Sequence, residues 1–131
     1  VIKKGLNGAT LIDDSYNANP LSMYAALQAL VNYPGESICI LGDMGELGET
    51  AHESHRELGH QAKKLGVRRL YAVGDLSRFT VEGFGDNAQH FPNKSALIAN
   101  IKQALENNMT VLIKGSASAK MEEVAAALTE N

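Results

Sequence analysis

The chain has 131 residues, 44% of them hydrophobic and 21% charged, proportions typical of one globular domain with a buried core. Its formal net charge of −3 argues against a surface for nucleic acid or for an anionic membrane, because both need clustered Lys and Arg. No apolar run approaches the roughly 20 residues of a membrane span and no signal peptide is recognisable, so we expect a cytoplasmic protein.

Short apolar runs along the chain predict β-strands. Four of them are nearly continuous in apolar residues, as strands covered on both faces are, and a fifth is shorter. In chain order the predicted strands are Ala9–Asp14, Ser37–Gly42, Arg69–Gly74, the short Ala88–Phe91, and Thr110–Gly115. The single cysteine, Cys39, lies inside the second run, which predicts a buried and inert thiol.

Apolar residues between the strands recur at helical spacing and predict amphipathic helices. The stripes are Met23, Leu27, Leu30 and Val31; Ala51, His55, Leu58, Ala62 and Leu65; Leu97, Ile101, Ala104 and Leu105; and Met121, Val124, Ala125 and Leu128. Asn19 before Pro20 predicts a capped helix start, and Gly66 a helix end. The alternation predicts one three-layer α/β domain over residues 1–131, with a mostly parallel sheet of about five or six strands and helices on both faces.

Polar residues gather where the predicted strands end. Asp13 and Asp14 end the first strand and Lys114 the last; Asp43 and Asp75 follow a glycine at the ends of two others. Ligands of open parallel sheets bind outside the carboxyl ends of the strands. The sequence therefore predicts a binding site at this edge.

The segment Asp13–Pro20, "DDSYNANP", offers carboxylate, phenol and amide groups on one short loop. Turn chemistry is one interpretation, because Asp, Ser and Asn side chains bond nearby backbone. It accounts for Asn19 as a helix cap, but not for Tyr16 and Asn17 beside it. From the residues alone, ligand contact and a plain turn both stay open.

Two further loops carry candidate groups. "LGDMGELGET" fails the G-x-G-x-x-G dinucleotide pattern and reads as a flexible loop, although Asp43 could hold a ribose hydroxyl or the water shell of a cation. In "KGSASAKMEE", Lys114 and the first turn of a following helix could hold an anion. The alternative there is an ordinary turn capped by Ser116 or Ser118.

The segment "AHESH" resembles a metal-binding pattern only in part. The zinc-protease pattern H-E-x-x-H needs a histidine where Arg56 stands, so we expect no metal site. His55 lies on the apolar stripe and is expected to be a half-buried packing residue, while His52 could face the ligand. No Walker A loop, G-x-x-x-x-G-K-[ST], occurs in the chain, so we expect no phosphate cradle.

Taken together, "DDSYNANP", "LGDMGELG" with His52 and His55, "VGDLS" and "KGSASAKMEE" resemble, in that order, the carboxyl-terminal domain of the Mur ligase family. Within the family they are most similar to the ligases that add D-alanyl-D-alanine to UDP-N-acetylmuramoyl-tripeptide in peptidoglycan synthesis. The resemblance covers essentially the whole chain. It implies a Rossmann-like fold, and a longer enzyme with an amino-terminal domain for the uridine nucleotide and a central P-loop ATPase domain.

The resemblance also implies roles for residues. The family uses ATP to form an amide bond through an acyl phosphate, and its central domain holds most of the Mg²⁺ contacts. The resemblance therefore implies no catalytic residue within this domain alone. Contacts to the base and ribose of ATP are implied for Asp14, Tyr16, Asn17 and Asn19. Contacts to the incoming amine substrate are implied for Asp43, His52, Asp75, Ser77, Lys114 and Ser116. The last motif departs from the family's K-G-S-R, because Ala117 stands in place of the arginine.

Two other interpretations stay open. One is the equivalent domain of a related ligase, of the folylpolyglutamate synthase type, which "SYNANP" fits less well. The other is a non-enzymatic receiver-like phospho-switch, since Asp13, Asp14, Asp43 and Lys114 imitate its acid and lysine set. Against the receiver, Asp43 ends the second predicted strand, whereas the phosphoacceptor belongs at the end of the third.

Overall fold

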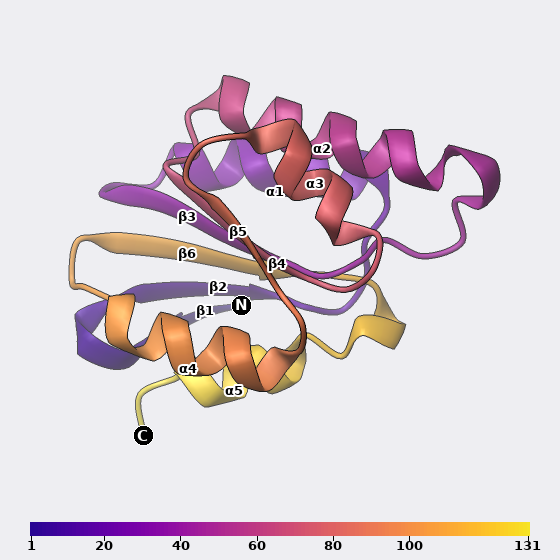
Figure 1. The fold of residues 1–131 in the computed structure, drawn as a ribbon. Helices are drawn as coiled ribbons and strands as arrows, with labels where there is room; N and C mark the ends of the chain where they lie inside the picture. Colours follow the sequence, from indigo (N-terminus) through magenta and orange to yellow (C-terminus); the bar gives the residue numbers. More distant parts are fainter.

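The computed structural model describes residues 1–131 as a six-stranded sheet between two layers of helices (Figure 1). Its strands are β1 (Ile2–Lys4), β2 (Thr10–Asp14), β3 (Glu36–Leu41), β4 (Arg69–Val73), β5 (Ala88–Phe91) and β6 (Met109–Lys114). They lie in the order β1-β2-β6-β3-β4-β5. Only β1 is antiparallel to its neighbour, so the carboxyl ends of the other five meet at one edge.

The helices are α1 (Pro20–Val31), α2 (Ala51–Leu65), α3 (Ser77–Phe84), α4 (Lys94–Ala104) and α5 (Glu122–Leu128). Helices α1, α2 and α3 cover one face of the sheet, and α4 and α5 cover the other (Figure 1). Three-residue 3-10 turns lie at Leu6–Gly8, Gly48–Thr50 and Ala117–Ala119. The predicted three-layer α/β fold is confirmed.

Each face of the sheet has its own apolar core, which is why the central strands are apolar on both sides. Under α1 to α3 lie fourteen buried residues, among them Met23, Leu27, Leu58 and Phe84. Under α4 and α5 lie sixteen, among them Leu97, Ile101 and Val124. Cys39 is fully buried, as predicted, and burial raises the pKa of its thiol far above the ordinary value. No helix is long and apolar enough to cross a membrane.

Local sequence signals set the ends of two helices as predicted. The Asn19 side chain accepts from the Ser22 N–H at 2.9 Å, and the Ser22 hydroxyl accepts from the Asn19 N–H at 3.1 Å, a reciprocal capping box at the start of α1. Gly66 ends α2 in the left-handed conformation, with φ of 101°.

Two elements were not predicted, β1 and α3. Strand β1 has only three residues at the sheet edge, with Ile2 exposed, so its pattern is weak. Helix α3 buries Ser77 and Thr80 together with Phe84, and polar residues on the inner face remove the apolar stripe that reveals a helix.

The prediction for the segment after Lys114 was wrong in one respect. No helix opens there: Ala117–Ala119 forms a 3-10 turn and Lys120 is left-handed, with φ of 52°. Helix α5 begins only at Glu122, has seven residues and carries Glu122 and Glu123 in its first turn, which disfavours an anion. Neither Ser116 nor Ser118 caps a helix; their hydroxyls bond each other at 3.1 Å.

Candidate functional site

The loops that follow the parallel strands converge at the carboxyl edge of the sheet and enclose three cavities. The turn after β6, which contains Ser116–Ala119, stands between the loop after β2 and the loops after β4 and β5. It contributes a residue to each of the three cavities. The predicted site edge is therefore hollowed, with this turn as its centre.

The loop after β2 is held from below by Lys114. The Lys114 side chain is only 4% exposed, and its ammonium contacts a carboxylate oxygen of Asp14 at 3.0 Å and donates to the carbonyl oxygen of Asn17 at 2.6 Å. Both partners of the Lys114 ammonium are residues of this domain. The structure thus gives Lys114 the role of fixing the loop that carries the predicted nucleotide contacts, rather than a free charge for a substrate.

The top of this loop is open. Tyr16 is 88% exposed, and the amide of Asn17 uses only its oxygen internally, accepting from the Ala18 N–H at 2.9 Å. The phenol ring of Tyr16 and the side-chain NH₂ of Asn17 are thus both exposed to solvent. Asn19 is the helix cap of α1, so the turn interpretation holds for Asn19 but leaves the Tyr16 ring and the Asn17 NH₂ without an internal partner.

Asp13 points away from the site. Its carboxylate contacts the Lys3 ammonium at 3.0 Å and accepts from the Ser15 hydroxyl at 2.6 Å. Partial burial opposes ionisation, but these two partners outweigh it and lower the pKa of Asp13 below its ordinary value. Asp13 is therefore a structural residue that ties β2 to β1.

Asp43 caps a helix from a distant part of the chain. Its carboxylate accepts from the Ser77 N–H at 2.8 Å, the Ser77 hydroxyl at 2.7 Å and the Leu76 N–H at 3.3 Å. The two N–H groups lie at the start of α3, where they have no partner within the helix, and α3 has no side-chain cap of its own. Asp43 and the fully buried Ser77 thus join the loop after β3 to the loop after β4.

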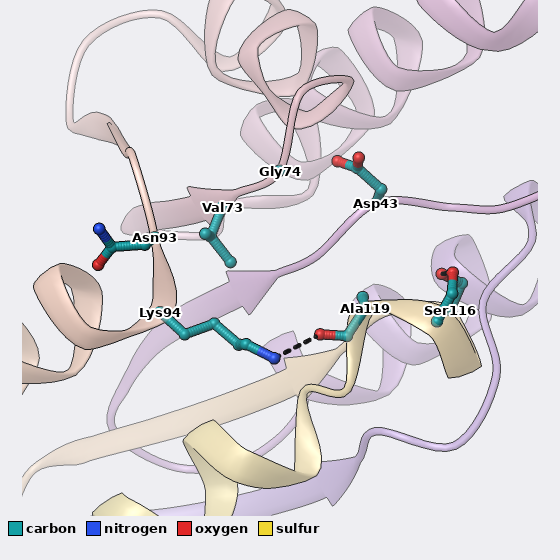
Figure 2. Close-up of a pocket in the computed structure, with 8 residues that line it drawn as sticks. Asp43, Val73, Gly74, Asn93, Lys94, Ser116 and Ala119 are labelled. Carbon is teal, nitrogen blue, oxygen red and sulfur yellow. Dashed lines mark hydrogen bonds between the residues drawn. The ribbon is translucent and has the colours of Figure 1, made fainter.

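A cavity of about 310 Å³ opens beside Asp43, and Figure 2 shows the residues that line it. Their side chains include one carboxylate, one ammonium, hydroxyls, an amide and small apolar groups. The lining consists of Asp43, Val73, Gly74, Asn93, Lys94, Ser116, Ser118 and Ala119. We call this space the Asp43 cavity.

Asn93 and Lys94 were missed in the sequence. Asn93 caps α4 by accepting from the Ala96 N–H at 2.8 Å. The Lys94 ammonium donates to the carbonyl of Ala119 at 3.1 Å (Figure 2). It also contacts the Glu123 carboxylate at 3.0 Å. Both residues follow the short strand Ala88–Phe91, so the rule that pointed to the other strand ends could have found them.

The other two cavities adjoin at Asn17 and Ala117, which line both, and we call them together the Asn17 groove. Their volumes are about 450 and 540 Å³. The lining residues are Ser15, Tyr16, Asn17, Ala18, Asn19, Gly45, Glu46, Leu47, Ser116, Ala117, Ser118 and Glu122. Glu46 and Glu122 are the only charged side chains among them, so the groove has hydrogen-bonding groups but no cation.

Four of the predicted substrate residues line none of these cavities: His52, Asp75, Ser77 and Lys114. His52 stacks on Phe79 of α3, with ring centroids 4.3 Å apart, and lines none of them. Asp75 is exposed, and its carbonyl accepts from the Arg78 side chain at 3.0 Å. His55, expected to be half-buried, is fully buried and hydrogen-bonded at both ring nitrogens. No group of three or more His, Cys, Asp or Glu side chains is placed to hold a metal ion.

Comparisons with known proteins show the family and the fold of the chain. The family described as "Mur ligase, glutamate ligase domain" matches residues 1–117. The UDP-N-acetylmuramoyl-tripeptide–D-alanyl-D-alanine ligase of Escherichia coli K12 is 45% identical over 125 residues, which cover 92% of this chain and 27% of that protein. The chain therefore spans about a quarter of the length of this curated relative.

Solved structures show the same fold. A crystal structure of MurF from Acinetobacter baumannii matches with a TM-score of 0.86 and 32% identity, over 94% of this chain and 28% of that one. MurF ligase from Thermotoga maritima, in complex with ADP, matches with a TM-score of 0.85 over 96% of this chain and 29% of that one. At 22% identity, the second match supports the fold alone. With a family match that covers residues 1–117, the chain belongs to the Mur ligase family.

Proposed function

We propose that the chain is the carboxyl-terminal domain of an ATP-dependent ligase that adds D-alanyl-D-alanine to UDP-N-acetylmuramoyl-tripeptide. The E. coli relative bears the name of this ligase at 45% identity. In the proposed reaction, the γ-phosphoryl group of ATP passes to the tripeptide's carboxylate, giving an acyl phosphate and ADP. The dipeptide's amine then attacks the acyl carbon and expels phosphate as the amide forms, losing a proton.

The observation that carries the nucleotide part of the proposal is the open Asn17 groove without a cation. Tyr16 offers a ring face for the base, and the Asn17 amide a donor for its edge. Asp14 lines neither cavity of the groove, but its carboxylate is 44% exposed and would accept from a ribose hydroxyl. Asn19, as the cap of α1, fixes the end of the loop.

The phosphates belong elsewhere in this proposal. The groove's charged side chains, Glu46 and Glu122, would repel a triphosphate, and the nearby Lys114 ammonium is buried and already bonded. A central P-loop ATPase domain of the longer chain would hold the phosphates and Mg²⁺. Positioning and charge stabilisation supply most of the catalysis of phosphoryl transfer, so we expect this domain to be inactive alone.

The Asp43 cavity is the best candidate for the dipeptide. A dipeptide presents an amine, a carboxylate and two methyl groups, and the cavity wall has acceptors at Ser116 and Asp43, one cation at Lys94, and apolar surface at Val73 and Ala119. Lys94 is the only cation that lines the cavity, and Ala117 stands where the family has an arginine. We therefore assign the dipeptide's carboxylate to Lys94. The ammonium would exchange its present partners for it, namely the carbonyls of Ala119 and Lys120 and the carboxylate of Glu123.

The alternatives are less well supported. A receiver needs an accessible phosphoacceptor, but the Asp43 carboxylate already accepts from three groups of α3, and family membership points away from a receiver. A folate-type ligase would share the family, and the name of the E. coli relative favours the dipeptide-adding ligase over it.

A chimera tests the proposal. This chain would replace the matching stretch of the E. coli ligase, and the product would be assayed with ATP, UDP-N-acetylmuramoyl-tripeptide and D-alanyl-D-alanine. We expect ligation by the chimera and none by the 131-residue chain. Tyr16→Ala should raise KM for ATP, and Lys94→Met should raise KM for the dipeptide, each by about tenfold, the equivalent of one lost interaction of about 1.4 kcal/mol. A folded chimera that turns over glutamate instead of the dipeptide would contradict the assignment.

A further inference from the structure

The segment Met44–Leu47 forms the wall of the Asn17 groove that faces the loop after β2. Gly45, Glu46 and Leu47 line the groove opposite Asn17 and Asn19. The proposed contacts to the base and ribose do not include this segment. Its shape decides how wide the groove is, so what holds it in place bears on ligand binding.

Hydrogen bonds to backbone carbonyls anchor the chain at both ends of the segment. On one side the Ser116 N–H donates to the Asp43 carbonyl at 2.9 Å, and on the other the Thr50 hydroxyl donates to the Leu47 carbonyl at 2.9 Å. Between these anchors, residues 44–46 make a single hydrogen bond to the rest of the chain, from the Met44 N–H to Nε2 of His55 at 3.0 Å.

The geometry fixes the chemical state of His55. Its Nε2 accepts from the Met44 N–H and so carries no proton, while Nδ1 lies 2.7 Å from the carbonyl of Ala51 and must donate to it. The side chain is fully buried, and Met44 is 1% exposed, so water cannot replace the acceptor. Nδ1 is satisfied within α2, by the carbonyl of its first residue, so Nε2 alone ties α2 to the loop.

The segment adopts a backbone that needs such support. Glu46 has φ of 57°, a left-handed conformation that residues other than glycine and asparagine adopt at a cost. This turn places the acidic Glu46 in the groove wall. A carboxylate there suits a neutral ligand with hydrogen-bond donors and disfavours a phosphate.

We propose that His55 is a positioning residue for nucleoside binding: it holds Met44–Leu47 as a preformed wall of the Asn17 groove. The inference rests on the proposed function, in which the groove takes the base and ribose. His55 touches no ligand itself and acts through the Met44 N–H. An acceptor at the position of Nε2 is what the role requires.

The test compares two variants at this position with one on the same helix. His55→Phe keeps the ring volume but removes the acceptor; His55→Gln places Oε1 near the position of Nε2. His60→Phe is the matched control, because His60 is exposed on α2. Amide hydrogen exchange is measured in the free chain, and adenosine binding by amide chemical shifts.

We expect His55→Phe to speed exchange of the Met44 amide by about tenfold or more, the effect of losing one buried acceptor. Its Kd for adenosine should rise by a similar factor, with strand amides still protected. His55→Gln should stay within about threefold of wild type, as should His60→Phe. Equal loss of affinity in the Phe and Gln variants would reduce His55 to core packing and overturn the proposal.

A second measurement needs no variant. Long-range ¹H–¹⁵N spectra of the wild-type imidazole should show His55 protonated at Nδ1 and bare at Nε2, and the opposite tautomer would overturn the proposal even if His55→Phe does not fold. Normal adenosine binding by a folded His55→Phe chain would refute the inference and leave the proposed function standing. A wild-type chain that does not bind adenosine would refute both.

Discussion

Replacing Lys114 by methionine should loosen the loop that carries Tyr16 and Asn17. The variant removes the ammonium that contacts Asp14 at 3.0 Å and the Asn17 carbonyl at 2.6 Å, and keeps most of the buried alkyl stem. Breaking a fully buried ion pair costs about 3–5 kcal/mol. Asp14 is 44% exposed and its charge can return to water, so the cost should fall to about 2 kcal/mol, mostly from the unpaired carbonyl.

Urea unfolding measures that cost, and amide shifts of residues 15–19 report the loop. Lys120→Met is the matched control, since Lys120 is exposed and its ammonium makes no hydrogen bond or ion pair, and it should change stability by less than about 0.5 kcal/mol. A double-mutant cycle with Asp14→Asn isolates the pair itself. If Lys114→Met cost no more than the control and left residues 15–19 unmoved, Lys114 would not hold this loop.

Three further predictions concern the scaffold. Asn19→Ala should lower the free energy of unfolding by about 1 kcal/mol in urea, because it removes the cap in α1's capping box; an unchanged midpoint would contradict that role. Gly59→Ala should lower the free energy of unfolding by about 3 kcal/mol, because a Cβ would lie 2.0 Å from the Thr80 carbonyl of α3. Gly66→Ala should lower it by only about 1 kcal/mol, because Gly66 faces open space and has φ of 101°. Equal losses of stability would refute close packing of α2 on α3. Because the pKa of Asp13 is lowered in the folded state, its ionised form stabilises the fold above the ordinary value of 3.8, and that contribution is lost as the pH falls further. The difference in stability between wild type and Asp13→Asn should therefore be constant above about pH 5 and shrink below about pH 4, and a constant difference down to pH 2 would contradict the role given to Asp13.

Strands β2 to β6 and four of the five helices could be predicted because their signals are local. The strands β2, β3, β4 and β6 are continuous apolar runs, and Asn19–Pro20 and Gly66 mark helix ends by their own backbone preferences. Helix α3 has no such signal. It packs so close to α2, through Gly59 and Gly83, that its inner face needs small and polar residues in place of an apolar stripe.

The carboxyl edge could also be predicted, but not the work of each side chain there. The sequence shows that Asp43 and Lys114 lie at strand ends. Only the fold shows that Asp43 accepts hydrogen bonds from the start of α3 and that Lys114 donates to the loop after β2. His55 is similar, since its bond to Met44 spans a loop whose path is set by tertiary contacts. Chemical type was visible in the sequence, whereas the partner was not.

In the proposed function, this domain holds the nucleoside half of ATP and another domain holds the phosphates. Titration of the ¹⁵N-labelled chain with adenosine and with ATP distinguishes the two halves of the nucleotide. We predict weak binding, with Kd of about 1 mM for both ligands, and shifts at residues 14–19 and 45–47. Adenosine that leaves residues 14–19 unmoved, while ATP shifts mainly residues 114–118, would contradict the account.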